Sequence, residues 1–151
     1  MSTKIFVSLP VKDLDRSVKF FKGLGFNFNS QFTNTDAACM IASDDIYFML
    51  LTHDKFAGFT SRSICDTSKS VEMGLRLSLE SRAAVDDMVK KAMAAGATSV
   101  GDAEDHGFMY EHGFADLDGH TWDFMWMDAG FAQKWNGRPA GKSAAQSSGR
   151  P

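Results

Sequence analysis

The chain has 151 residues, of which 44% are hydrophobic and 23% are charged, and its formal net charge is −3. This length supports one compact domain with a substantial core and is short for two large domains. The mildly acidic charge lacks the basic face that binds a phosphate backbone, so we expect no nucleic-acid partner. No apolar run approaches the roughly 20 residues that span a bilayer and no signal-peptide pattern is present, so we expect no membrane association and a cytoplasmic location.

The first half of the chain has the pattern of a strand, a helix and three more strands. Residues 4–10 alternate and are rich in β-formers, which predicts a strand. From Asp13 onward an amphipathic pattern predicts a helix, with Asp13 or Asp15 as N-cap and Gly23 and Gly25 as stop signals. Polar turn residues separate the three short strands that follow, at residues 26–32, 37–42 and 46–51.

The second half repeats this order after a polar excursion. A strand is predicted at residues 71–79 and a helix at residues 81–95, with Ser81 as its cap. Three further strand candidates follow, at residues 98–100, 108–114 and 121–127. The two halves therefore predict a βαβββ duplication with an offset of about 70 residues.

The predicted domain, residues 1–128, divides into three parts and is followed by a tail. The parts are a first module at residues 1–52, an excursion loop at 53–70 and a second module at 71–128. Residues 129–151 are rich in Gly, Ser and Ala, which predicts a flexible tail with Phe131 and Trp135 as its only anchors.

Two stretches resemble one known superfamily. Residues 11–26 (VKDLDRSVKFFKGLGF) and 116–126 (DLDGHTWDFMW) are similar to the opening and closing segments of the vicinal-oxygen-chelate superfamily of glyoxalases, bleomycin-resistance proteins and extradiol dioxygenases. Residues 105–110 (DHGFMY) look like a subgroup of predicted lactoylglutathione lyases. The resemblance implies an α+β fold in which two βαβββ modules form a curved mixed sheet around a central pocket. It also implies a homodimer.

Metal-dependent members of this superfamily hold a divalent ion with four side chains. The resemblance places those positions on Phe6, Met49, Gly74 and Asp123, and of these only Asp123 has a donor atom that suits the ion. We therefore expect neither a metal nor another cofactor.

Strand alternation predicts which side chains line the pocket, because residues two apart share one face of a strand. The predicted lining has an apolar floor and a few polar groups, and consists of Phe6, Ser8, Met49, Glu72, Gly74, Arg76, Glu111, Thr121, Asp123 and Met125. An inward Arg76 requires a counter-ion. Either it pairs with Asp123 or Glu72, or it receives an anionic ligand.

The candidates for catalysis are Asp123, Glu111 and His106, with no role fixed for any of them. The same alternation turns His112 away from the pocket. His53 and His120 fall in predicted loops or turns, where we expect both to be solvated.

The composition of this pocket is typical of a small-molecule site. We expect a pocket protein of the glyoxalase and bleomycin-resistance type that binds or transforms a small metabolite or drug. One alternative is a metal-dependent lyase or dioxygenase with ligands from Asp123, Glu111, Glu72 and His106. The other is a dimeric interaction module without catalysis.

Overall fold

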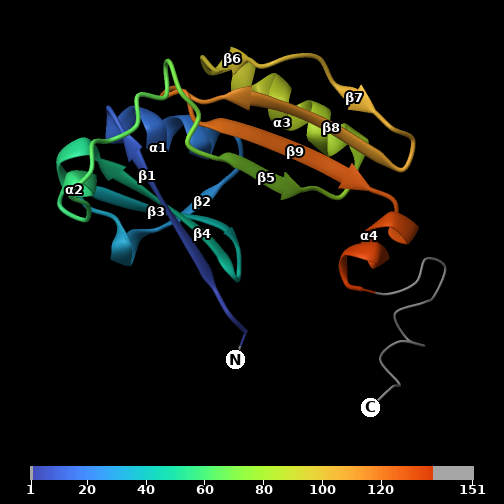
Figure 1. The fold of residues 1–151 in the computed structure, drawn as a ribbon, viewed down its shortest axis with the longest axis horizontal. Coiled ribbons are helices and arrows are strands. Elements are labelled where there is room, and N and C mark those ends of the chain that lie inside the picture. The colour runs from blue at the N-terminus through green and yellow to red at the C-terminus, as the bar shows by residue number, and fades with distance from the viewer. Residues whose placement is uncertain (1, 138–151) are drawn as a thin grey trace.

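The first module has the predicted βαβββ order. The computed structural model describes residues 2–137 (Figure 1). In chain order the elements of this module are β1 (Ile5–Val11), α1 (Leu14–Gly23), β2 (Asn27–Asn29), a 3-10 turn (Ser30–Phe32), β3 (Ala37–Ser43) and β4 (Ile46–Thr52). β1 lies parallel to β4, and the sheet has the order β1-β4-β3-β2. The parallel pair requires a crossover connection, which begins with α1.

The second module repeats this topology with one short strand added. Its elements are β5 (Gly74–Ser78), α3 (Arg82–Ala94), β6 (Thr98–Ser99), β7 (Glu104–Asp105), β8 (Met109–Ala115) and β9 (Thr121–Met127). The sheet has the order β5-β9-β8-β6, and β7 pairs with the remaining part of β8. β5 is parallel to β9, as β1 is to β4. The predicted duplication and the α+β fold are therefore confirmed, in the form of two sheets.

The two long helices begin and end where their capping residues predict. Asp13 accepts a hydrogen bond from the backbone of Arg16 at the start of α1, and Ser81 accepts one from Ala84 at the start of α3. Gly25 and Gly96 follow the two helices with φ of 106° and 108°, a backbone conformation that favours glycine.

One core joins both modules. Trp122 of β9 is fully buried, and its ring lies 5.2 Å from Phe21 of α1 and 4.8 Å from Phe48 of β4. Phe20 of α1 also contacts Phe114 of β8, at 6.0 Å between ring centroids. Helix α1 also contacts β3 and β4, so it packs against both sheets, and the opposite face of each sheet is left for the predicted pocket.

Three segments differ from their predicted bounds. The strand predicted at 26–32 ends at Asn29, because the Asn29 side chain caps a 3-10 turn. The excursion contains α2 (His53–Ala57), capped by Thr52. Residues 71–73 precede β5 instead of belonging to it.

The segment predicted as a flexible tail begins with a helix, α4 (Ala129–Trp135), so that prediction is wrong for these residues. Asp128 caps this helix, and the Phe131 ring packs 4.6 Å from that of Phe108. Trp135 stays 70% exposed. Residues 138–151 lie outside the described part of the chain. Among the helices within residues 2–137, none has the length and apolar character to cross a membrane.

Candidate functional site

A charged triad occupies the open face of the second sheet. Arg76 of β5 pairs in register with Asp123 of β9, and Glu111 lies on the next strand, β8. The Arg76 Nη2 atom is 2.9 Å from Glu111 Oε1, and its Nε atom is 3.9 Å from Asp123 Oδ2. The Arg76 side chain is 47% exposed, whereas Glu111 is 17% exposed. The predicted pairing of Arg76 with Asp123 is present, and its closer partner is Glu111, not Glu72.

Gly113 makes room for this triad. It pairs with Asp123 in the β8–β9 ladder, and a Cβ atom at this position would overlap the Asp123 carboxylate and the Trp122 carbonyl oxygen. Any side chain here would therefore displace Asp123 from Arg76 or distort the ladder.

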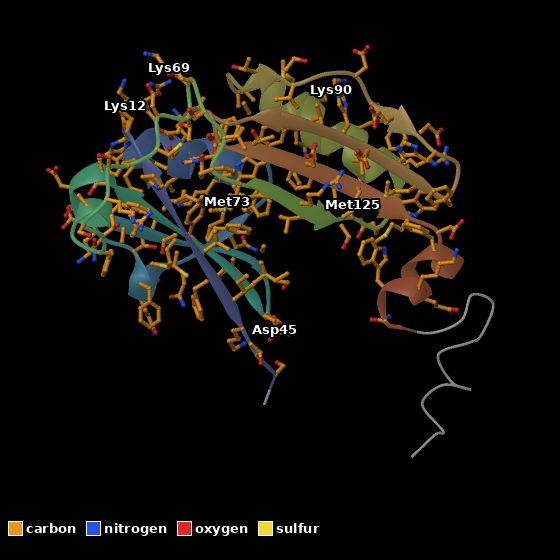
Figure 2. All side chains as sticks on the ribbon, in the orientation of Figure 1. Lys12, Asp45, Lys69, Met73, Lys90 and Met125 are labelled. Atoms are coloured by element: carbon orange, nitrogen blue, oxygen red, sulfur yellow. The ribbon has the colours of Figure 1, made fainter. Side chains whose placement is uncertain are left out.

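A pocket of about 250 Å³ lies between β1, the excursion and the residues before β5. Ser8 on β1 faces Glu72 and Met73 across it, so both modules contribute walls. Its apolar lining comes from Leu9, Pro10, Phe56, Ile64 and Met73. Met73 is 42% exposed here and precedes the first residue of β5, Gly74. Figure 2 labels Met73 and Met125 on the second module.

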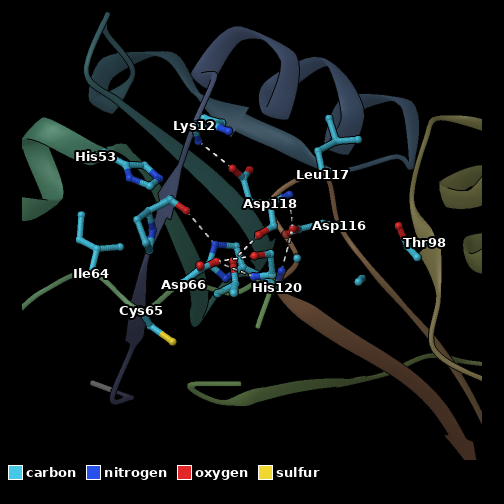
Figure 3. Close-up of a pocket in the computed structure, with 15 residues that line it drawn as sticks. Lys12, His53, Ile64, Cys65, Asp66, Thr98, Asp116, Leu117, Asp118 and His120 are labelled. Carbon is cyan, nitrogen blue, oxygen red and sulfur yellow. Dashed lines mark hydrogen bonds between the residues drawn. The ribbon is translucent and has the colours of Figure 1, made fainter. Parts of the chain in front are cut away.

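A larger groove, of about 670 Å³, adjoins this pocket and is lined by the turn Asp116–His120 (Figure 3). The two pockets share Pro10, Ile64, Cys65 and Thr67. The turn connects the modules, because the Asp118 carboxylate accepts hydrogen bonds from the Lys12 backbone at 2.7 Å and from the Ser17 hydroxyl at 3.2 Å.

His120 lies at the junction where the Asp116–His120 turn meets β1 and the residues before β5, and it is only 2% exposed. Its Nε2 atom is 2.7 Å from the Pro10 carbonyl oxygen, and its Nδ1 atom is 2.8 Å from Glu72 Oε1. Both partners are acceptors, so both ring nitrogens are placed to donate, which is the arrangement that suits an imidazolium. The prediction that His120 is solvated is wrong, because the turn is covered by β1 and the residues before β5.

The groups around His120 favour the positively charged form of its ring. Burial lowers the pKa of His120, but the Asp116 charge, the Pro10 carbonyl and the Glu72 carboxylate raise it by more, so the net shift from 6.5 is upward. Burial also raises the pKa of Asp116, although this carboxylate accepts hydrogen bonds from the Trp122 indole and from two backbone N–H groups. The buried pair of Asp116 and His120 was not predicted from the sequence. The only sequence feature that pointed to it was the polar DLDGH turn before a buried strand.

Comparisons with known proteins agree with this architecture. The model of the family described as bleomycin resistance protein-like N-terminal matches residues 3–43. A glyoxalase/bleomycin resistance protein/dioxygenase family enzyme from Burkholderia phytofirmans is similar at 16% identity, with a TM-score of 0.69, over 83% of this chain and 99% of that one. This similarity shows that the chain has the fold of the glyoxalase/bleomycin resistance protein/dioxygenase structures.

Two other solved structures show the same fold. A hypothetical protein from S. aureus is 25% identical, with a TM-score of 0.71, over 83% of this chain and 94% of that chain. A glyoxalase-related enzyme from Fulvimarina pelagi is 18% identical, with a TM-score of 0.70, over 83% and 88% of the two chains. None of the curated proteins matches the sequence.

The positions at which metal-dependent members of the superfamily carry ligands do not suit a metal in this chain. Phe6 is 59% exposed and stacks on Tyr47, and Gly74 has no side chain and no neighbouring atom within 4 Å of its Cβ position. Met49 offers only a thioether, and Asp123 has the Arg76 cation beside it. One carboxylate that is already paired does not replace the hydration shell of a divalent ion.

The predicted pocket residues fall into two groups. Ser8 and Glu72 line the 250 Å³ pocket, while Glu111 and Asp123 line a separate pocket of about 180 Å³ beside β8. Gly74, Thr121 and Met125 flank the triad by ladder register, and Met49 lies opposite Ser8.

Two further histidines, His106 and His112, lie at the outer edge of the second sheet. His106 follows β7, where its Nε2 atom is 3.5 Å from Glu104 Oε2. His112 alternates with Glu111 along β8 and is 3.1 Å from the Gly101 carbonyl oxygen.

Proposed function

We propose that this protein is a member of the vicinal-oxygen-chelate superfamily and that it binds a small molecule in the pocket between its two modules, without using the superfamily's metal positions. The observation that carries the proposal is the pocket formed by Ser8, Glu72 and Met73 beneath the excursion. Its walls are mostly apolar with a few polar groups, as is usual for ligand sites. Its volume of about 250 Å³ suits a metabolite smaller than a drug, because drug-sized sites typically have about 300–1,000 Å³.

The charged residue in the lining of this pocket is Glu72, which favours a neutral or cationic ligand over the anion that Arg76 suggests. Arg76 is not part of the lining, and Glu111 and Asp123 already lie beside its guanidinium. An anion would therefore meet no guanidinium in the pocket lining, whereas an ammonium group would meet the Glu72 carboxylate, which His120 holds in place.

The alternative of a metal-dependent lyase or dioxygenase receives less support at these residues. It would need Glu72 and Asp123 as ligands of one ion, but Glu72 lines the 250 Å³ pocket and is held by His120 at 2.8 Å, whereas Asp123 lines the separate pocket of about 180 Å³. Whether the bound molecule is also transformed is a separate question, for which Asp123, Glu111 and His106 stay the candidate groups.

A thermal-shift experiment with matched ligands tests the proposal. Phenethylamine and 3-phenylpropionate share an aromatic body and differ in charge. We expect the amine to raise Tm by about 5–10 °C at a concentration of about 100 times its Kd, because a ligand stabilises only the folded state that binds it. The acid should have a smaller effect.

A pair of variants locates the binding. Met73→Trp fills the pocket and should abolish the shift, whereas Val71→Trp makes the same change two residues away at a side chain that is 73% exposed and outside the lining. Equal shifts in the two variants would place the ligand elsewhere. An absence of any shift across amines, acids and neutral aromatics in the wild-type protein would favour the interaction-module alternative.

A further inference from the structure

A second set of donor atoms gathers at the outer edge of the second sheet, away from the superfamily's ligand positions. Glu104, His106 and Glu111 each present one ligand atom, and these atoms all lie within 4.8 Å of one another. We infer that the three residues bind one divalent transition-metal ion, with His106 supplying nitrogen and the glutamates supplying oxygen. This site does not depend on the small-molecule pocket proposed above.

The backbone explains why the three side chains converge. β7 pairs with β8 so that Glu104 lies directly opposite Glu111, and paired residues project from the same face of a sheet. His106 is two residues beyond Glu104, and its backbone N–H donates to the Met109 carbonyl oxygen at 2.8 Å. The connection between β7 and β8 therefore turns back over the two glutamates.

The local charge favours a cation. Like charges directly opposite in a ladder repel each other, and the Glu104–Glu111 pair is such an arrangement. Arg76 offsets Glu111 from one side only, at 2.9 Å. Asp102 and Asp123 line the adjoining pocket of about 180 Å³ together with both glutamates. That pocket adds negative charge and leaves room for water molecules to complete the coordination.

The site is also held in place before any ion binds. The Arg82 guanidinium donates to Asp105 Oδ2 and to the Gly107 carbonyl oxygen, each at 2.9 Å, so it anchors the residues on both sides of His106. Ligands fixed by such outer contacts bind more tightly than ligands on a free loop.

The donor set selects the class of ion. One imidazole nitrogen and two carboxylate oxygens suit Zn²⁺, Co²⁺ or Ni²⁺, whereas Mg²⁺ and Ca²⁺ prefer oxygen alone. A site of three protein ligands with open positions leaves the ion accessible to water.

Titration with Co²⁺ tests the site directly, because its visible absorption reports coordination. The full chain without an affinity tag should bind one Co²⁺ saturably, Zn²⁺ should displace it, and Mg²⁺ should not. His106→Ala and Glu104→Gln should each weaken binding by about tenfold or more, because even outer-shell changes cost that much. His53→Ala, on exposed helix α2, is the matched control and should bind Co²⁺ as the wild-type protein does.

Two results would overturn the inference. Equal affinity of the wild-type protein and His106→Ala would remove the imidazole from the site. A lack of saturable Co²⁺ binding in the wild-type protein would mean that His106 and Glu104 lie 3.5 Å apart without forming a metal site. Neither result would affect the Met73→Trp experiment, so this site and the small-molecule pocket fail or stand separately.

Discussion

At the scale of single residues, polar groups in this protein are set by contacts that come from distant parts of the chain. Asp123 can lie beside Arg76 because position 113, on the neighbouring strand, has no side chain. Buried His120 has an acceptor at each of its nitrogens because Pro10 and Glu72 come together around it. Strand alternation predicted that Arg76 and Asp123 lie on the same face of the sheet, but it carries no information about which segment covers His120.

His120 should make the stability of the protein depend on pH. Its pKa is raised in the folded state, so its contribution is fully present below the unfolded value of about 6.5 and is lost as pH rises through the higher folded value. His120→Gln leaves Glu72 or the Pro10 carbonyl without a donor, which costs about 1–3 kcal/mol. We expect this deficit in urea unfolding to be larger at pH 5.5 than at pH 8.5.

The control for this prediction is His53→Gln, an exposed histidine outside the junction hydrogen bonds. It should follow the pH profile of the wild-type protein. The prediction fails if His120→Gln lowers the free energy of unfolding by the same amount at both pH values, since the protonated ring would then add nothing to the stability of the fold.

At the scale of elements, the sequence was most informative where local pattern and burial coincide. β9 has its predicted bounds, and Ser81 caps α3 as predicted. β7 was missed because Glu104 and Asp105 have no β-forming pattern, and their pairing depends on β8 and on Arg82. The order of the strands could therefore be predicted from the sequence, whereas the edge that carries the metal-ligating cluster could not.

Arg82 should control the order of the segment that follows β7. Its guanidinium lies 5.0 Å from the Trp126 ring and 5.7 Å from the Tyr110 ring, in addition to its bonds to Asp105 and Gly107. The side chain is 43% exposed, so we expect Arg82→Ala to cost only about 1 kcal/mol of unfolding free energy. The clearer effect should be faster amide exchange at residues 104–109.

Hydrogen exchange measured by mass spectrometry checks this, with Arg16→Ala on α1 as the control for loss of a surface arginine. Faster exchange confined to residues 104–109 in Arg82→Ala is the expected result. Unchanged exchange there would show that the β7–β8 pairing holds the segment without Arg82.

At the scale of the whole molecule, the two modules share a core on one side and leave their other faces open. Helix α1 packs against both sheets, whereas the first strand presents Ile5 at 53% exposure and Phe6 at 59%. Met73, before β5, is 42% exposed. Phe6, which stacks on Tyr47 and stays 59% exposed, presents an apolar surface of the kind that another molecule covers.

We propose that a second copy of the chain covers this surface, since identical chains most often pair about a two-fold axis. Light scattering should then give a mass of twice 16.6 kDa. Phe6→Glu places a charge on the exposed strand and should shift the mass toward one chain, because an unpaired buried charge opposes association. Phe32→Glu, at a side chain that is 62% exposed at the far edge of the same sheet, should leave the mass unchanged. A mass of 16.6 kDa for the wild-type protein at every concentration would instead mean that Phe6 remains in contact with solvent or with a ligand.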